Sequence, residues 1–499
     1  MNFEDKMAPI EERFNRFTSK FNHLYYSNYY MLLLLAIAFL TWLFNASIVG
    51  MVLLGVLSIF VLVTNKDISP VLPIMPLMLM VISSSAFLKN PKNIYAIVVA
   101  GVLFSIGLFF NIIFYRHRYR GGKLTISFVL ISVMIFIGGI GSKYIWHYFV
   151  NFHFMISLGP MILAIYVYAT SCIFIPKDVD ARLYFTKQIV LLAFICALQI
   201  LVSHIRIGGE LIDHFRAVLN VGWTNRAGLV IILMLGLGSA FYLADENPRF
   251  NFILYHFAFA LYLAIMMTSS RGGMLFGTLE MIALTIYLFV KSKHKIKFSI
   301  VFAMWAIAGI TILIVKRDFF LELLDKFKDL GLSTTGRTTL FKEAIELFKQ
   351  YPILGVGFGF RGTHYFDEDC LYWFHSTILQ VLASMGIIGG IVYTYYYVKK
   401  FRILFAKRDS FSMLITISLI AFELHSLIDA GTFEPLPFLY MAVLMNTFVE
   451  LVNRKEDDQR IAEHLDDMAN KYKLSHSVVA TSSENNLDVI TNLEDTQND

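Results

Sequence analysis

The stretch Met266-Met267-Thr268-Ser269-Ser270-Arg271-Gly272-Gly273 places an arginine between two strongly apolar runs. Each run is long enough to cross a bilayer, which takes about 20 apolar residues of helix. A cation at such a junction lies at a membrane surface, because its charge must stay in contact with water or headgroups. The stretch therefore predicts a helical membrane protein with a charged group at one face of the bilayer.

The composition supports the membrane class. Of 499 residues, 57% are hydrophobic and 16% are charged, whereas a soluble domain has about 25% charged residues. Many charges precede the first apolar run and no small-residue cleavage pattern follows it, so we expect this run to be a membrane anchor. Three cysteines are too few for a disulfide framework. We expect no metal and no cofactor, and the net charge of +5 reflects the basic loops rather than nucleic-acid binding.

Hydropathy predicts an all-α polytopic membrane protein with about 14 (12–14) spans. The expected spans are 30–46, 47–63, 70–88, 94–115, 124–143, 154–175, 185–205, 226–243, 250–268, 271–290, 298–315, 374–398, 411–428 and 434–452. The third carries Pro70, Pro73 and Pro76, which predict a kinked or re-entrant segment.

Clusters of basic residues predict the orientation. They are Arg116, Arg118, Arg120 and Lys123; Lys291, Lys293, Lys295 and Lys297; and Lys399, Lys400, Arg402, Lys407 and Arg408. On the expected spans all three clusters lie on the side of both termini, which the positive-inside rule makes the cytoplasm. We therefore expect a cytoplasmic N-terminus at 1–29, a membrane domain at 30–453 and a long extracytoplasmic loop at 316–373. The polar tail at 454–499 is expected to be mostly disordered in the cytoplasm.

The long loop carries an organised segment. Apolar residues recur at helical spacing between Thr338 and Gln350, and Tyr351-Pro352 ends the pattern, so we expect an amphipathic helix. The following Ile353-Leu354-Gly355-Val356-Gly357-Phe358-Gly359 has glycines at alternate positions. It is either a flexible connector or a cradle of exposed amides for an anion or a sugar.

Several motifs occur in a fixed order around this loop. They are Ser270-Arg271-Gly272 opening a span, Gly336-Arg337 four residues before Phe341, Tyr351 to Gly357, His375, and Met385-Gly386-Ile387-Ile388-Gly389. In this order the sequence resembles the bacterial O-antigen ligase/polymerase (Wzy/WaaL-like) membrane proteins, over roughly residues 220–400. Two positions depart from the family pattern, which commonly has Asn where Ser376 stands and Trp where Phe341 stands. Neither departure removes a charged group.

The resemblance implies a membrane glycosyltransferase of the GT-C-like, all-helical type that needs no metal. Its substrates would be undecaprenyl-diphosphate-linked glycans, joined to one another by a polymerase or moved to a lipid, protein or cell-wall acceptor by a ligase. A polymerase would work beside a flippase and a chain-length regulator, at the outer face of the bacterial cytoplasmic membrane. The competing hypothesis from another class is a transporter or flippase without chemistry, although no internal repeat favours it.

The candidate catalytic residues are Arg271 and His375. An arginine binds the oxygens of a leaving diphosphate through its planar fork, and a histidine accepts a proton near neutral pH. The alternatives are a snorkelling arginine and an ordinary interfacial histidine. Further candidates for binding the diphosphate or glycan are Arg337, Arg226, Arg216, Gly355 and Gly357. Glu423, His425 and Asp429 lie in or just after the span 411–428 and are possible supporting residues. Glu423 would need a partner, for which we expect an arginine across the bundle.

Overall fold

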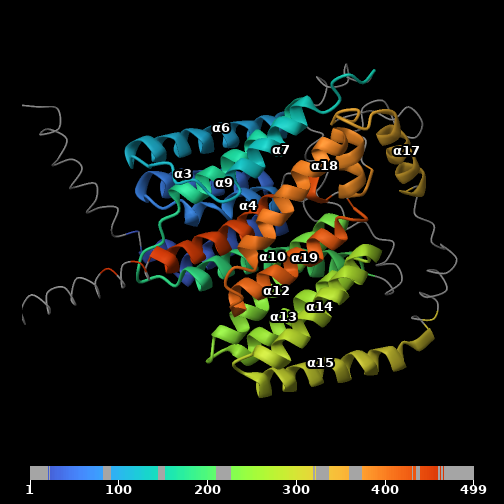
Figure 1. Cartoon of the computed structure of the whole chain (residues 1–499). Coiled ribbons are helices and arrows are strands. Elements are labelled where there is room, and N and C mark those ends of the chain that lie inside the picture. Colours follow the sequence, from blue (N-terminus) through green and yellow to red (C-terminus); the bar gives the residue numbers. More distant parts are fainter. Residues whose placement is uncertain are drawn as a thin grey trace, which may run out of the picture. The chain divides into compact units, whose positions relative to one another are not determined.

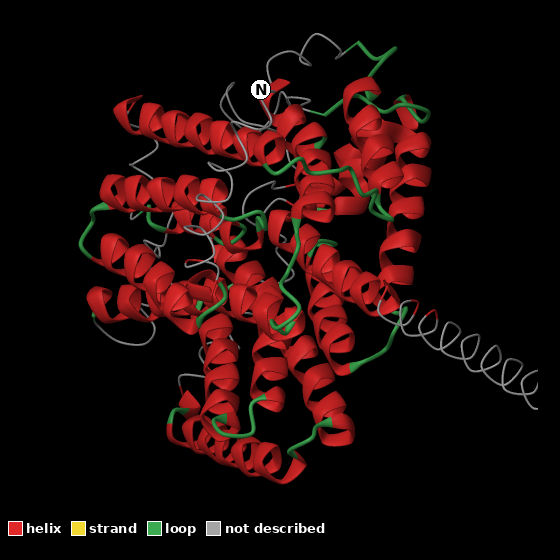
Figure 2. Ribbon diagram, turned by 90° about the vertical axis from the view of Figure 1, so that its left-hand side faces the viewer, coloured by secondary structure: helices red, strands yellow, loops and turns green. Residues whose placement is uncertain are grey.

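The structure is an assembly of helices. The computed structural model describes residues 21, 23–82, 91–143, 152–208, 226–318, 321, 337–358, 374–429, 431–433, 439–458, 461 and 465. Helices and loops, and no strands, make up this part of the chain (Figure 2). The all-α class predicted from hydropathy is confirmed.

Figure 1 shows the arrangement of the described helices. Those of the first half are α2 (Asn28–Leu43), α3 (Ser47–Thr64), η1 (Ser69–Val71), α4 (Ile74–Met80), α6 (Pro91–Phe114), α7 (Thr125–Ile137), α8 (Phe152–Leu158), α9 (Pro160–Cys172) and α10 (Ala181–Ile207). Those of the second half are α12 (Arg226–Glu246), α13 (Asn251–Met267), α14 (Arg271–Lys291), α15 (Lys295–Val315), α17 (Arg337–Gln350), α18 (Thr377–Leu404), α19 (Ser410–His425), η3 (Gly431–Phe433) and a helix over residues 440–458.

Each expected span contains helix among the described residues. Within the described part of the chain, seven helices are long and apolar enough to cross a membrane by length and composition, and six further apolar helices are shorter. The segment with three prolines is interrupted as predicted, because its described residues form the 3-10 turn η1 and the separate short helix α4. The chain is thus a helical membrane protein, and the expected number of spans and their orientation stay predictions.

Helix α12 is the centre of the second half. It is buried along almost its whole length and packs against α10, α13, α14 and α19. Close approach to α19 depends on Gly238, because a Cβ there would lie 2.2 Å from the carbonyl oxygen of Leu414. The Oγ of Ser418 accepts a hydrogen bond from the Gly238 N–H at 3.0 Å. This packing holds the helices that carry the candidate residues.

Helices α14 and α19 run antiparallel over their full lengths. Gly272 lies against His425 at one end, and the Ser418 hydroxyl donates to Glu280 Oε1 at 2.6 Å in the middle. At the other end the Tyr287 hydroxyl donates to Ser410 Oγ at 3.4 Å. The start of α14 and the end of α19 are therefore neighbours.

The expected span at 374–398 coincides with α18, which bends sharply at Gly386. This glycine has φ 64° and ψ −161°. Leu382 Cδ2 lies 3.3 Å from the position that a Cβ on Gly390 would take, although residues eight apart in a straight helix are separated by about 12 Å along its axis. The two arms of α18 are thus folded toward each other.

The segment that follows α17 binds the backbone groups that this bend leaves free. Val356 N–H donates to Ala383 O at 2.8 Å, Gly357 N–H donates to Ser384 O at 3.0 Å, and Ile387 N–H donates to Pro352 O at 2.8 Å. A backbone group inside a membrane protein must find such a partner, since hydrocarbon offers none. The predicted amphipathic helix α17, which buries Leu340, Ala344 and Leu347, is thereby attached to α18.

One lysine of the third basic cluster, Lys400, is buried inside the protein. Lys400 is only 1% exposed and its ammonium group pairs with Glu423 on α19. The sequence places Lys400 in a basic cluster, and its burial and its pairing with a carboxylate are visible only in the structure. The chain forms two compact units, Met1–Val449 and Glu450–Asp499, and within the second unit Arg454 pairs with Glu450 at 3.4 Å.

The bend provides a test of the fold. A Cβ on residue 386 would lie 2.3 Å from the carbonyl carbon and oxygen of Ile353, so Gly386→Ala must move backbone as well as adopt a positive φ. Gly141 also has a positive φ (87°) but no atom within 4 Å of its Cβ position. We expect Gly141→Ala to cost about 1–2 kcal/mol and Gly386→Ala clearly more, measured as the thermal unfolding midpoint of the purified proteins. Equal midpoints would contradict the close docking described here.

Candidate active site

Asp429 joins two of the candidate residues. Its Oδ1 lies 3.1 Å from His375 Nδ1, and its Oδ2 lies 3.5 Å from Arg337 Nη2. Arg337 begins α17, His375 immediately precedes α18, and Asp429 follows α19. The fold therefore brings together an arginine, a carboxylate and an imidazole that are up to 92 residues apart in the sequence.

The turn after α19 positions Asp429 relative to His375. Within this turn the Asp429 N–H donates to His425 O at 3.1 Å. The start of α18 is tied to the same turn, because the Thr377 N–H donates to Ser426 O at 2.9 Å. His375 itself has φ 48°, a left-handed conformation that is uncommon for residues other than glycine and is typical of functional sites.

The site is partly buried. The side chain of Asp429 is 15% exposed, while those of Arg337 and His375 are 31% and 38% exposed. Burial raises the pKa of the Asp429 carboxyl, but the hydrogen bond with His375 and the positive charges of His375, Arg337 and His425 lower it more. The net pKa lies below the usual range of a carboxyl group, so Asp429 is an anion at neutral pH.

This arrangement determines which imidazole nitrogen is available. A carboxylate can only accept hydrogen bonds, so the contact with Asp429 places the proton of neutral His375 on Nδ1. Nε2 then carries the lone pair. A partly exposed imidazole oriented in this way can accept a proton from a hydroxyl group.

The start of α14 lies beside this group. A Cβ on Gly272 would lie 2.9 Å from Ile428 Cδ1 and 3.1 Å from His425 Nε2, and one on Gly273 would lie 2.5 Å from Val230 Cγ2. Only glycines at both positions let the start of α14 approach α19 and α12 so closely. Arg271, the first residue of α14, is exposed next to the turn that carries Asp429.

His425 lies beneath the site. It is 1% exposed, and its Nδ1 is buried without a hydrogen-bond partner among the described residues. Its ring packs edge-on against Phe276 with 6.1 Å between the centroids. The structure thus places His425 as a buried neighbour of the start of α14.

Glu423 has a partner, but it is not the arginine expected from the sequence. Lys400 pairs with one of its oxygens, and the Tyr397 hydroxyl donates to the other at 2.8 Å. Both partners come from the second arm of α18. Because the bend at Gly386 brings this arm back to α19, sequence spacing alone could not identify the pair.

Gly355 and Gly357, which the sequence places in either a connector or a cradle, lie against α18. Gly355 N–H donates to Tyr351 O at 3.0 Å, and Gly357 N–H donates to Ser384 O. A Cβ on Gly355 would lie 2.5 Å from Ala383 O. These glycines permit close docking of the loop on α18, and their amides are occupied by the protein's own backbone.

The remaining two candidates are only partly described. Arg226 is the first residue of α12, and Val230 of the same helix lies against Gly273. Arg216 lies outside the described residues.

An apolar hollow of about 710 Å³ lies between the two arms of α18 and the end of α19. Its walls include Ile378, Leu382 and Leu427, and its polar residues include Glu423 and Thr377. The Oγ1 of Thr377 is buried and has no hydrogen-bond partner among the described residues. Thr377 follows His375 by two residues, so the hollow begins next to the candidate base.

The protein is thus a helical membrane protein. Its candidate site consists of a partly exposed histidine, carboxylate and arginine near an apolar hollow. The particular family follows from comparison: residues 256–394 match the family described as O-antigen ligase. This match confirms the resemblance to O-antigen ligase/polymerase proteins, and it supports an activity of that type in polysaccharide synthesis. No curated protein matches the chain.

Two features of the site were missed from the sequence. Gly272 and Gly273 were treated only as part of a motif, although paired small residues at a helix start are a signal for close helix packing. Asp429 was only a possible supporting residue, because its connection to His375 and Arg337 depends on three elements that meet in space.

The depressed pKa of Asp429 predicts a pH-dependent effect on stability. A lowered pKa in the folded state means that the ionised carboxylate stabilises the fold above the unfolded-state pKa of about 4. That stabilisation is lost as the pH falls through the lower folded-state pKa. The unfolding midpoint of wild type should therefore exceed that of Asp429→Asn at pH 7, and the difference should shrink below about pH 4. A difference that is absent at pH 7 or grows on acidification would contradict the pairing.

Proposed function

We propose that this protein is a polymerase of undecaprenyl-diphosphate-linked oligosaccharide repeat units in bacterial surface polysaccharide synthesis. The observation that carries the proposal is Asp429 bound to both His375 and Arg337, next to the start of α14 and an apolar hollow. The match to the O-antigen ligase family supports the reaction type. The polysaccharide would be an O-antigen, a capsule or an exopolysaccharide.

In the proposed reaction, a hydroxyl oxygen of the acceptor glycan attacks the anomeric carbon of the donor. A new C–O bond forms while the bond between that carbon and the diphosphate oxygen breaks. The electron pair of the broken bond leaves with the diphosphate. The hydroxyl proton passes to His375 Nε2, and Asp429 stabilises the imidazolium that results.

The arginines stabilise the leaving diphosphate. Arg271 is exposed at the start of α14, so its guanidinium can bind phosphate oxygens in a bidentate way. Arg337 is only weakly paired with Asp429 at 3.5 Å and is the second candidate for this contact. Their attraction for the diphosphate grows as negative charge develops on it during the reaction. Arg226 and Arg216 are further candidates for the same role.

The apolar hollow along α18 would hold the polyprenyl chain of a lipid-linked substrate. Most of its lining residues are apolar, and its polar side chains include those of Thr377, Thr394 and Glu423. A chain seated there would bring its polar end to His375.

A ligase that transfers a finished glycan to a lipid, protein or cell-wall acceptor is the second candidate, and the family's description favours it. The same residues would perform the same chemistry with a different acceptor. A transporter or flippase without chemistry is the third. We propose that the site faces outward from the bacterial cytoplasmic membrane, where a polymerase would work beside a flippase and a chain-length regulator.

Loss of the site should change the surface glycan. A deletion strain complemented with His375→Ala, Asp429→Asn or Arg271→Ala should lose at least about 100-fold in polymer yield, a typical effect of removing a general base or a charged stabilising group. Electrophoresis of surface and lipid-linked glycan measures this. Single repeats accumulating would indicate a polymerase, and long chains left on the lipid carrier would indicate a ligase.

A matched control is Arg317→Ala. Arg317 is an exposed arginine just beyond α15, and we expect full activity from this variant. Normal glycan from all three site variants, with each protein present in the membrane, would exclude the proposed chemistry and favour a transporter.

The hollow predicts a dependence on lipid chain length. Gly390 lines it, so Gly390→Leu should narrow it and raise the KM for a long-chain polyprenyl-diphosphate donor. A short-chain, water-soluble donor should be affected much less, because it does not need the hollow. An equal rise in KM for both donors would show that the substitution disturbs the catalytic site rather than the binding of the polyprenyl chain in the hollow.

A further inference from the structure

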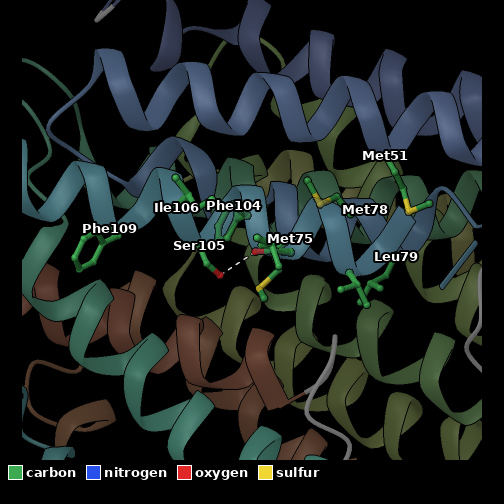
Figure 3. A pocket seen from close by; sticks show the side chains of 11 residues that line it. Met51, Met75, Met78, Leu79, Phe104, Ser105, Ile106 and Phe109 are labelled. Carbon is green, nitrogen blue, oxygen red and sulfur yellow. Dashed lines mark hydrogen bonds between the residues drawn. The ribbon is translucent and has the colours of Figure 1, made fainter. Parts of the chain in front are cut away.

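Glu423 distinguishes the hollow along α18 from a second hollow of about 740 Å³ in the first half of the chain. The second hollow lies between α3, α4 and α6 (Figure 3), and its described lining residues are apolar apart from Ser105. The hollow along α18 contains a carboxylate, because the side chain of Glu423 lines it and is 14% exposed. A charged group in the wall of a membrane protein is costly, which makes it a candidate for a specific role.

The second arm of α18 holds both oxygens of this carboxylate. The Lys400 ammonium pairs with Glu423 Oε1, and the Tyr397 hydroxyl donates to Oε2 at 2.8 Å. The ammonium is buried and lies 5.8 Å from the ring centroids of Tyr396 and Tyr397 and 6.0 Å from that of Phe401. Aromatic faces stabilise a desolvated cation. Lys400 is therefore held in one place by a carboxylate and three rings.

Glu423 connects two groups of helices. The second arm of α18 packs against α7, where the ring centroids of Tyr396 and Phe128 lie 5.4 Å apart. Helix α19, which carries Glu423, packs mainly against α12 and α14. The hollow lies between these two groups, so the contact of Lys400 with Glu423 helps to set the distance between its walls.

Both arms of α18 hold the same end of α19. The first arm does so through Thr377, whose N–H donates to Ser426 O at 2.9 Å. The second arm does so through Lys400 and its contact with Glu423, three residues before Ser426. Residues three apart are neighbours on one side of a helix, so the two attachments hold one turn. Asp429 follows this turn by three residues, so its position depends on both attachments.

We propose that Lys400 and Tyr397 are positioning residues of the candidate site. Through Glu423 they hold the end of α19 so that the Asp429 carboxylate remains beside His375. The inference rests on the proposed function, because it concerns the same transfer of a proton to the imidazole. Lys400 and Tyr397 do not contact the reacting atoms. They act through the supporting contacts on which the accurate placement of a catalytic group depends.

The test is a double-mutant cycle on the purified full-length protein in lipid nanodiscs. The substrate is the lipid-linked glycan that accumulates in the deletion strain, and product formation gives kcat and KM. We expect Tyr397→Phe to lower kcat several-fold and Lys400→Met to lower it by up to about 100-fold, the scale on which a misplaced catalytic geometry acts. KM should change much less than kcat, because the apolar lining of the hollow is kept.

The deciding measurement is made in the Asp429→Asn background. If Lys400 and Tyr397 act through Asp429, their substitutions should lower kcat no further there. Losses that multiply with that of Asp429→Asn would overturn the proposal, and so would a wild-type kcat for Tyr397→Phe. Lys400→Met leaves a buried carboxylate unpaired; if this variant does not fold, Tyr397→Phe decides alone, because it removes a single hydroxyl. Full activity of Asp429→Asn would reject the proposed function itself, and this inference with it.

Lys399→Met and Tyr395→Phe are the matched controls. Both residues belong to the same arm, and the Lys399 ammonium lies over the ring of Tyr395, 5.6 Å from its centroid, rather than beside Glu423. Both variants should keep wild-type kcat and KM. Losses as large as those of Lys400→Met and Tyr397→Phe would overturn the proposal, since they would show that any change to this arm impairs the site.

Discussion

The carboxylate of Asp429 is the interaction on which the candidate site depends. It accepts from His375 and pairs with Arg337, so a single anion orients the imidazole and holds the start of α17 beside it. The ionised form is stable in this partly buried place because three positively charged or polar neighbours outweigh the cost of burial. Without that anion the neutral imidazole would lack a fixed tautomer.

The need to hydrogen-bond every buried backbone group explains how the loop that follows α17 becomes part of the membrane domain. A sharp bend at Gly386 would leave carbonyl and N–H groups of α18 unpaired, which is costly away from water. The segment from Pro352 to Gly357 pairs with these groups. The same bend returns the second arm of α18 to α19, where Lys400 meets Glu423. One glycine therefore determines the position of α17, the shape of the apolar hollow and the partner of a carboxylate.

Much of the helical architecture was predictable, because apolar runs in a membrane protein form helices for a local reason. The end of α17 at Tyr351-Pro352 was likewise a local effect. The bend of α18 was not predictable, since Gly386 is an ordinary glycine in an apolar run as far as the sequence shows. Its role depends on the segment from Pro352 to Gly357 that packs against it. The sequence could not decide between a connector and a cradle at Gly355 and Gly357, because whether an amide is free depends on what packs against it.

The sequence by itself determined the membrane class, the places of the helices and the residue types available for chemistry. Its motif order also indicated the family that the match over residues 256–394 supports. The tertiary structure alone decided that Asp429 connects His375 to Arg337, that Lys400 is buried with Glu423, and that α14 starts against the end of α19. These are contacts between elements distant in the sequence. They depend on close approaches at Gly272, Gly273 and Gly386, which no periodicity records.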